Sequence, residues 1–182
     1  TVGEPGFDTP QPVVDAAIEA LEAGQTKYTR GPGSMELCTQ ISEQLNRMWD
    51  LKSTPETVMV TPGAKQALLY AMMVTMEAGD ELLVPAPAWP TYEGQTALLG
   101  INIVFTETND LFHPIIESMR SSITERTKAI LLNSPNNPTG AVYTPEEIQA
   151  IVELAVEHDL WIISDEIYAR LLWVDWPHVS PA

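Results

Sequence analysis

Three short polar clusters in this sequence each follow an apolar run, and each contains residue types that can do chemistry. The last, residues 164–168 (SDEIY), follows the apolar run at residues 160–164 (LWIIS). A carboxylate at the end of a buried apolar run destabilises the fold unless it has a cationic partner. Asp165 therefore indicates a site that binds a positively charged group. The competing interpretation is that Asp165 is an ordinary helix N-cap.

The first cluster, residues 61–68 (TPGAKQAL), joins an apolar run to a helical pattern. Free backbone N–H groups and the helix dipole make a helix start a favourable place for a phosphate. Gly63 and Ala64 are small enough to let an anion approach the backbone there. The alternative is a common turn and helix cap, with no ligand.

The middle cluster, residues 133–140 (NSPNNPTG), is a loop braced by two prolines directly after an apolar run. Such bracing fixes the amide side chain of Asn137 in one place. An Asx-rich turn without any binding role is the alternative, because Asn and Pro are common in turns.

The elements that must position these clusters alternate between helices and short strands, which is typical of a parallel sheet covered by helices. We therefore predict an α/β fold with three layers and a mostly parallel sheet, in which ligands bind beyond the carboxyl ends of the strands. Helices are expected over residues 12–21, 34–51 with Ser34 as N-cap, 64–76, 92–99, 115–122 and 144–157, and strands over residues 57–61, 81–84, 101–105, 129–132 and 160–164.

Composition excludes several classes of protein. The chain has 182 residues, a hydrophobic fraction of 45% and a net charge of -16, which disfavours nucleic acid and anionic membranes as partners. The single cysteine, Cys38, leaves no internal disulfide or cysteine-based metal cluster and favours the cytoplasm. We expect no bound metal, no signal peptide and no membrane span.

Together and in this order, the clusters resemble motifs of pyridoxal 5'-phosphate (PLP)-dependent aminotransferases of fold type I, class I/II, the aspartate aminotransferase-like enzymes. The resemblance runs from Gly3 to about Leu172 and includes two further pieces, residues 28–33 (YTRGPG) and 87–92 (PAWPTY). It implies a large cofactor-binding domain with a parallel sheet.

The resemblance also implies a role for each matching residue. Asp165 would pair with the pyridine nitrogen of PLP and is, with Tyr168, the expected catalytic residue. Trp89 would stack on the ring, unless it is a core tryptophan. The remaining roles are contacts of Asn137 and Tyr168 with the ring oxygen, a phosphate cradle formed by Gly63, Ala64 and Lys65, a contact of Tyr28 with the phosphate of a partner subunit, and a place for Gly3 near the substrate carboxylate.

Three family residues have no counterpart here: the lysine that bonds to the cofactor, a phosphate-binding arginine and the arginine that binds the substrate carboxylate. The lysine that bonds to the cofactor follows the SDEIY motif in this family, whereas the lysines of this chain, Lys27, Lys52, Lys65 and Lys128, all precede Asp165. We therefore expect a fragment with an N-terminal segment and helix (residues 1–30) and a partial cofactor domain (residues 31–182), incomplete at the C-terminus.

The expected activity of the parent protein is the transfer of an amino group from an amino acid to a 2-oxo acid, in a homodimer. The motifs hold a cofactor without fixing the reaction, so another PLP reaction at the α-carbon, such as C–S lysis, stays open. The chain as given is also compatible with a non-catalytic binding or assembly module. A Rossmann dehydrogenase is excluded because no G-x-G-x-x-G follows a strand.

Overall fold

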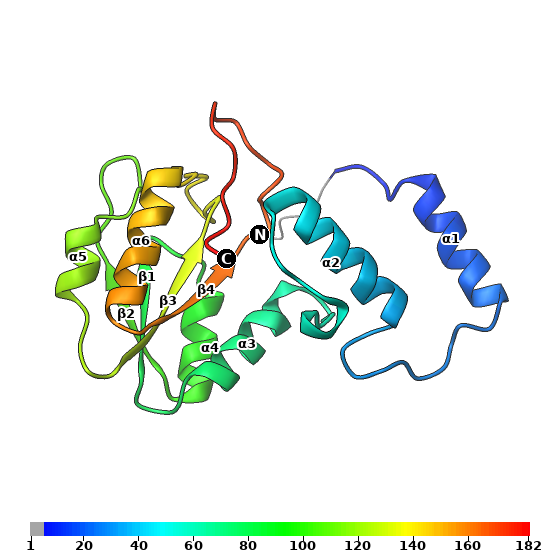
Figure 1. The fold of residues 1–182 in the computed structure, drawn as a ribbon, viewed down its shortest axis with the longest axis horizontal. Helices are drawn as coiled ribbons and strands as arrows, with labels where there is room; N and C mark the ends of the chain where they lie inside the picture. The colour runs from blue at the N-terminus through cyan, green and yellow to red at the C-terminus, as the bar shows by residue number, and fades with distance from the viewer. Residues whose placement is uncertain (1–5) are drawn as a thin grey trace.

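The computed structural model describes residues 6–182 and has the expected α/β fold (Figure 1). Strands and helices alternate from β1 onward, and three α-helices and one short 3-10 helix precede this region. The elements are α1 (Gln11–Glu22), α2 (Met35–Trp49), the 3-10 helix η1 (Pro55–Thr57), α3 (Ala64–Thr75), β1 (Glu81–Pro85), α4 (Thr91–Leu99), β2 (Asn102–Thr106), α5 (Ile116–Ser121), β3 (Thr127–Asn133), α6 (Pro145–Glu157) and β4 (Trp161–Asp165).

The sheet has four strands in the order β2-β1-β3-β4, and every neighbouring pair is parallel. Because parallel strands end at the same edge, the residues that follow them gather there. The register sets Asn133 opposite Asp165, so the ends of β3 and β4 bring two polar side chains side by side.

Alternating strand residues face two different helical layers, as the pleat of a strand requires. On one face, Leu82 and Leu131 pack with Leu68 of α3 and Tyr92 of α4. On the other face, the neighbouring strand residues, such as Ile130, pack with residues of α5 and α6. Figure 1 shows α5 and α6 on one side of the sheet and α3 and α4 on the other. The predicted three-layer arrangement is confirmed.

Local sequence signals place the helix starts. Ser34 accepts a hydrogen bond from the backbone N–H of Leu37, which makes it the N-cap of α2 as expected. Thr144 and Glu147 form a capping box at the start of α6, next to Pro145 at the first helical position. These caps fix where α6 begins, and therefore the length of the loop between β3 and α6.

The strand predicted over residues 57–61 is wrong. Residues 55–57 form η1, and the following residues are extended but pair with no strand of the described chain. The backbone N–H of Val60 instead donates to the carbonyl of Pro32 at 2.8 Å. Valine-rich runs favour extended backbone, but a strand exists only where a neighbour supplies the ladder of hydrogen bonds.

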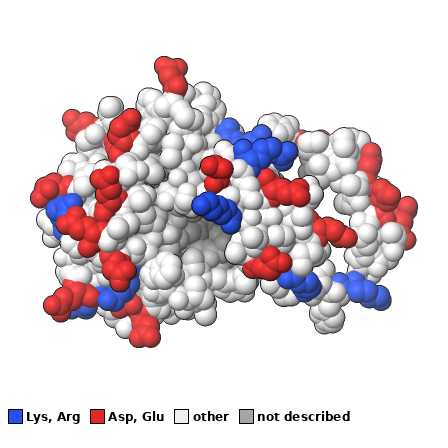
Figure 2. Space-filling model, viewed as in Figure 1, with Lys and Arg blue, Asp and Glu red and all other residues white. Residues whose placement is uncertain are grey.

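Helix α1 lies apart from the sheet and its layers (Figure 1). It buries none of its residues, and Val13, Ile18 and Leu21 are exposed. Acidic side chains cover much of the visible surface over α1 and over the layer of α5 and α6 (Figure 2). Within residues 6–182, no helix has both the length and the apolar character needed to cross a membrane.

Candidate functional site

The order of the strands places a crevice between β1 and β3. From β1 the chain passes through α4 outward to β2, whereas from β3 it passes through α6 in the opposite direction to β4. The two connections diverge on opposite faces of the sheet, so they leave a gap beyond the ends of these neighbouring strands. Open α/β sheets bind ligands at this kind of switch point.

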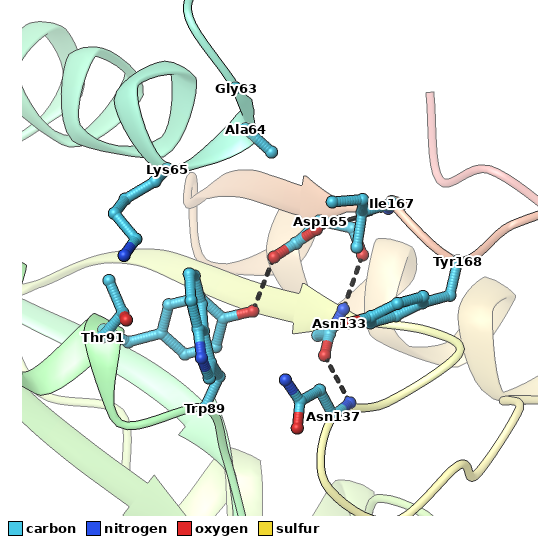
Figure 3. Close-up of a pocket in the computed structure, with 11 residues that line it drawn as sticks. Gly63, Ala64, Lys65, Trp89, Thr91, Asn133, Asn137, Asp165, Ile167 and Tyr168 are labelled. Atoms are coloured by element: carbon cyan, nitrogen blue, oxygen red, sulfur yellow. Dashed lines mark hydrogen bonds between the residues drawn. The ribbon is translucent and has the colours of Figure 1, made fainter. Parts of the chain in front are cut away.

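A cavity of about 520 Å³ lies at this place (Figure 3). Its lining comes from the start of α3, from the loop after β1 and the start of α4, from the end of β3 and the following loop, and from the segment after β4. The lining residues are Gly63, Ala64, Lys65, Trp89, Thr91, Tyr92, Asn133, Asn137, Asp165, Ile167 and Tyr168. All residues predicted for the cofactor site are thus brought together, except Tyr28.

Asp165 has only neutral partners in the described chain. Its side chain is buried, with an exposed fraction of 6%. One carboxylate oxygen accepts the Tyr92 hydroxyl at 2.8 Å and the other accepts the backbone N–H of Ile167 at 3.3 Å. No cationic side chain among residues 6–182 forms an ion pair with it. The N-cap alternative is not supported, because no helix of the described chain begins after β4.

Tyr92 and Asn133 are parts of this site that the sequence analysis did not assign. Burial, and next the negative charge of Asp165, raise the pKa of the Tyr92 phenol well above its usual range, so this hydroxyl stays a donor. Asn133 donates its amide to the backbone carbonyl of Asp165 at 2.9 Å and accepts the backbone N–H of Asn137 at 2.7 Å. A usable signal was present for Asn133, which ends its strand as Asp165 does. Tyr92 gave no such signal, because its contact with Asp165 joins positions 73 residues apart.

The start of α3 offers free backbone donors to the cavity. Gly63 is the N-cap residue with a φ of 85°, which favours glycine, and it provides no side-chain cap. The backbone N–H groups of Ala64 and Lys65 donate to no other group of residues 6–182. This geometry fits an anion at the helix start, as the sequence predicted.

The opposite wall of the cavity is aromatic and amide-bearing. Trp89 packs edge-on against Tyr92, with ring centroids 5.6 Å apart, and the Lys65 ammonium lies 5.2 Å from the Trp89 ring centroid. Figure 3 shows the Tyr168 ring beside Asn133, on the side away from Lys65, and Asn137 below Asn133. Trp89 packs partly against the core and also lines the cavity. One part of its surface is therefore that of a core tryptophan, and another part faces the cavity.

Two predicted residues do not join this cavity. Tyr28 lies in the segment between α1 and α2 and its side chain is fully exposed. Gly3 lies outside the described residues. Within residues 6–182, no group of His, Cys, Asp and Glu side chains is arranged to hold a metal ion.

Comparisons with known proteins agree with this geometry. The family described as aminotransferase class I and II matches residues 1–180. An aspartate/prephenate aminotransferase of Thermus thermophilus is 45% identical over 183 residues, covering 100% of this chain and 47% of that protein. An aspartate aminotransferase of Bacillus subtilis is 42% identical over 182 residues, covering 99% of this chain and 46% of that protein.

Solved structures show the same backbone. A variant of Thermus thermophilus aspartate aminotransferase superimposes with a TM-score of 0.96 at 45% identity, covering all of this chain and 50% of that one. An aromatic aminotransferase of Pyrococcus horikoshii gives a TM-score of 0.95 at 38% identity, covering 99% of this chain and 49% of that one. The chain spans about half the length of these relatives. It belongs to the class I and II aminotransferase family.

Proposed function

We propose that this chain supplies the cofactor-binding half of a PLP-dependent aminotransferase. The observation that carries the proposal is the buried Asp165 carboxylate, which lies at the switch point of the sheet and whose partners within the described residues 6–182 are all neutral. A protonated pyridine ring is a planar cation that this carboxylate suits. The free N–H groups at the start of α3 suit the phosphate of the same molecule.

Eight of the eleven lining residues then have a task. Asp165 holds the proton on the pyridine nitrogen, and the Tyr92 hydroxyl orients the carboxylate. Trp89 covers one face of the ring, and Asn137 and Tyr168 donate to the ring oxygen. Gly63, Ala64 and Lys65 hold the phosphate. When bound, PLP supplies an electron sink for charge that develops at the α-carbon of an amino acid.

We propose amino acids and 2-oxo acids as substrates. Aspartate is the first amino donor to test, because relatives that match the whole of this chain are named aspartate or aspartate/prephenate aminotransferases. The chain spans about half of those relatives, so the activity belongs to the full-length protein that carries this sequence. Gly3 is proposed to lie near the substrate carboxylate.

We also propose a homodimer in which Tyr28 reaches the phosphate site of the partner subunit. The full exposure of Tyr28, on a segment that extends away from the sheet toward α1, supports this placement. The same separation supports the division into an N-terminal segment (residues 1–30) and a partial cofactor domain (residues 31–182). A cytoplasmic location remains a proposal, supported by the single cysteine.

The test is an absorbance scan of the full-length protein with PLP, before and after addition of aspartate, followed by product analysis with a 2-oxo acid acceptor. We expect a protein-bound cofactor band that changes on addition of the amino acid, and a new amino acid formed from the acceptor. Asp165→Ala is the matched variant, and it should lose the spectral change.

Other outcomes would favour the other candidates. A C–S lyase would release a thiol and ammonia from a β-thioether amino acid and would not need an acceptor. A binding module would show the cofactor band without any response to amino acids. A full-length protein without any cofactor band would contradict the proposal as a whole.

A further inference from the structure

The segment that carries Asp165 and Tyr168 has little regular structure of its own. After β4 ends, residues 166–170 form turns rather than a helix or strand. Their backbone bonds are single turn contacts, from the N–H of Ala169 to the Glu166 carbonyl at 2.9 Å and from the N–H of Leu171 to the Tyr168 carbonyl at 2.8 Å. The position of Tyr168 therefore depends on side chains that hold this turn.

Glu166 anchors the turn from the side away from the cavity. Its carboxylate is well buried, and both of its oxygens are hydrogen-bonded. One oxygen lies 2.9 Å from Nε2 of His178, and the other accepts the hydroxyl of Ser180 at 2.8 Å. A carboxylate only accepts, so Nε2 of His178 carries the proton in this contact. We call these three residues the Glu166 cluster.

The Glu166 cluster connects three parts of the chain. His178 is more buried than Glu166, with a side-chain exposure of 5%, and its ring packs edge-on against Trp49 of α2 at 5.7 Å between centroids. The residues that follow the turn thus fold back, form hydrogen bonds to Glu166 and pack against α2. Burial opposes ionisation of Glu166, but hydrogen bonds from His178, Ser180 and Ser164 outweigh it and hold its pKa below the usual value.

We propose that the Glu166 cluster is a positioning device that fixes the turn between Asp165 and Tyr168 for contact with the cofactor ring. The inference rests on the proposed function. None of the three side chains lines the cavity, so each acts through the backbone on the residues that do. Asp165 and Tyr168 lie on either side of Glu166 along the chain, and displacement of this residue shifts both.

The chain offers a matched control, because a second buried histidine–glutamate pair lies elsewhere. His113 lies 2.7 Å from Glu147, with side-chain exposures of 15% and 24%, and Glu147 belongs to the capping box of α6. This pair has the same chemistry and similar burial but lines no part of the cavity. Its loss should affect stability without affecting the cofactor.

The experiment compares His178→Leu, His178→Gln and His113→Leu in the full-length protein. The measurements are the melting temperature, the Kd of PLP, the pH midpoint of the absorbance of the bound cofactor and kcat. For His178→Leu we expect weaker PLP binding, a raised pH midpoint because Tyr168 no longer donates well to the ring oxygen, and a loss in kcat of about tenfold or more, the scale of effect of a misplaced group. His178→Gln keeps a donor near the position of Nε2 and should restore all three.

His113→Leu should lower the melting temperature and leave the Kd and pH midpoint at wild-type values. If both leucine variants lose stability equally and both keep the wild-type Kd and pH midpoint, the positioning role is overturned. The proposed function is not affected by that result. A wild-type protein that binds no PLP would overturn the proposed function and this inference with it. Should His178→Leu not fold, Ser180→Ala carries the test: a shift in the same direction supports the role and wild-type values overturn it.

Discussion

A buried carboxylate lies at each end of the sheet, and the two differ in their partners. At the amino end, Glu81 begins β1 with a side-chain exposure of 7% and is bound by Arg126 at 2.7 Å and by Thr124 and Thr127. At the carboxyl end, Asp165 finishes β4 with 6% exposure and has the Tyr92 hydroxyl and one backbone N–H as partners. The first carboxylate has a cationic partner, and the second has none among residues 6–182.

This difference separates a structural ion pair from the proposed binding site. A buried charge that is neutralised within the fold contributes to stability, so its removal lowers the free energy of unfolding. A buried charge held by neutral donors alone is costly to the fold and suits a cationic ligand. Both carboxylates are buried, so burial alone does not distinguish their roles. Their hydrogen-bond and ion-pair partners do.

The largest expected effect is on activity at the carboxyl end. In the full-length protein, Asp165→Ala should reduce kcat by about 100-fold or more, because removal of a preorganised charge partner costs on that scale. Asn137→Ala should cost less, since Tyr168 can serve the same ring oxygen. Steady-state kinetics at saturating PLP checks this. A kcat of Asp165→Ala within about tenfold of wild type, or 1.4 kcal/mol in barrier, would make the assignment wrong.

At the amino end, the next largest effect should be on stability. Glu81→Gln should lower the free energy of unfolding by about 2 kcal/mol, because charge-assisted hydrogen bonds are lost. The kcat and the Kd of PLP should stay at wild-type values. Urea unfolding measures the first quantity. Arg126→Ala is the companion variant and should also destabilise, by about 1 to 3 kcal/mol, because it leaves the Glu81 carboxylate, with 7% exposure, without its cation. Loss of PLP binding in Glu81→Gln would contradict the comparison.

Low pH should remove the contribution of Glu81 to the stability of the wild-type protein. Hydrogen bonds from Thr124 and then Arg126 hold the pKa of Glu81 below its ordinary value of 4.5. A lowered folded pKa means that the stabilisation is complete above the unfolded value and is lost as the pH falls through the folded value. The urea midpoint of the wild type should therefore fall more steeply below about pH 4.5 than that of Glu81→Gln. Parallel curves for the two proteins would count against this role.

The smallest effect should come from the neutral partner of Asp165. Tyr92→Phe removes the hydroxyl that donates at 2.8 Å and should lower kcat by about tenfold, or 1.4 kcal/mol, with the charge of Asp165 still present. Tyr143→Phe is the matched control, a tyrosine equally buried but packed in the core near α6. An unchanged kcat for Tyr92→Phe would show that Asp165 is oriented by the strand alone.

Local sequence signals predicted most of the fold. The caps of α2 and α6, the apolar runs of β1, β3 and β4, and the glycine before α3 act within a few residues, so the sequence shows them directly. The exception at residues 57–61 is instructive. A strand depends on a neighbour elsewhere in the chain, and the composition of the run cannot reveal whether that neighbour is present.

The residues of the candidate site that belong to sequence motifs could be predicted. Residues that follow strands, such as Asp165 and Asn137, could be nominated because parallel strands end at one edge. Tyr92 could not, because its role depends on a contact with a residue 73 positions away. The Glu166 cluster was not predicted for the same reason. His178 and Ser180 lie 12 and 14 positions after Glu166 and contact it only in the folded chain.

The contact between Tyr92 and Asp165 also has a consequence for the order of folding. The two residues are 73 positions apart, and β4 reaches the sheet only by pairing with β3. Contacts between distant positions form late because loop closure opposes them. During synthesis, α4 and the first three strands can assemble before β4 has left the ribosome. On this order the Tyr92 hydroxyl is in place before its carboxylate arrives, and the docking of β4 brings the two together.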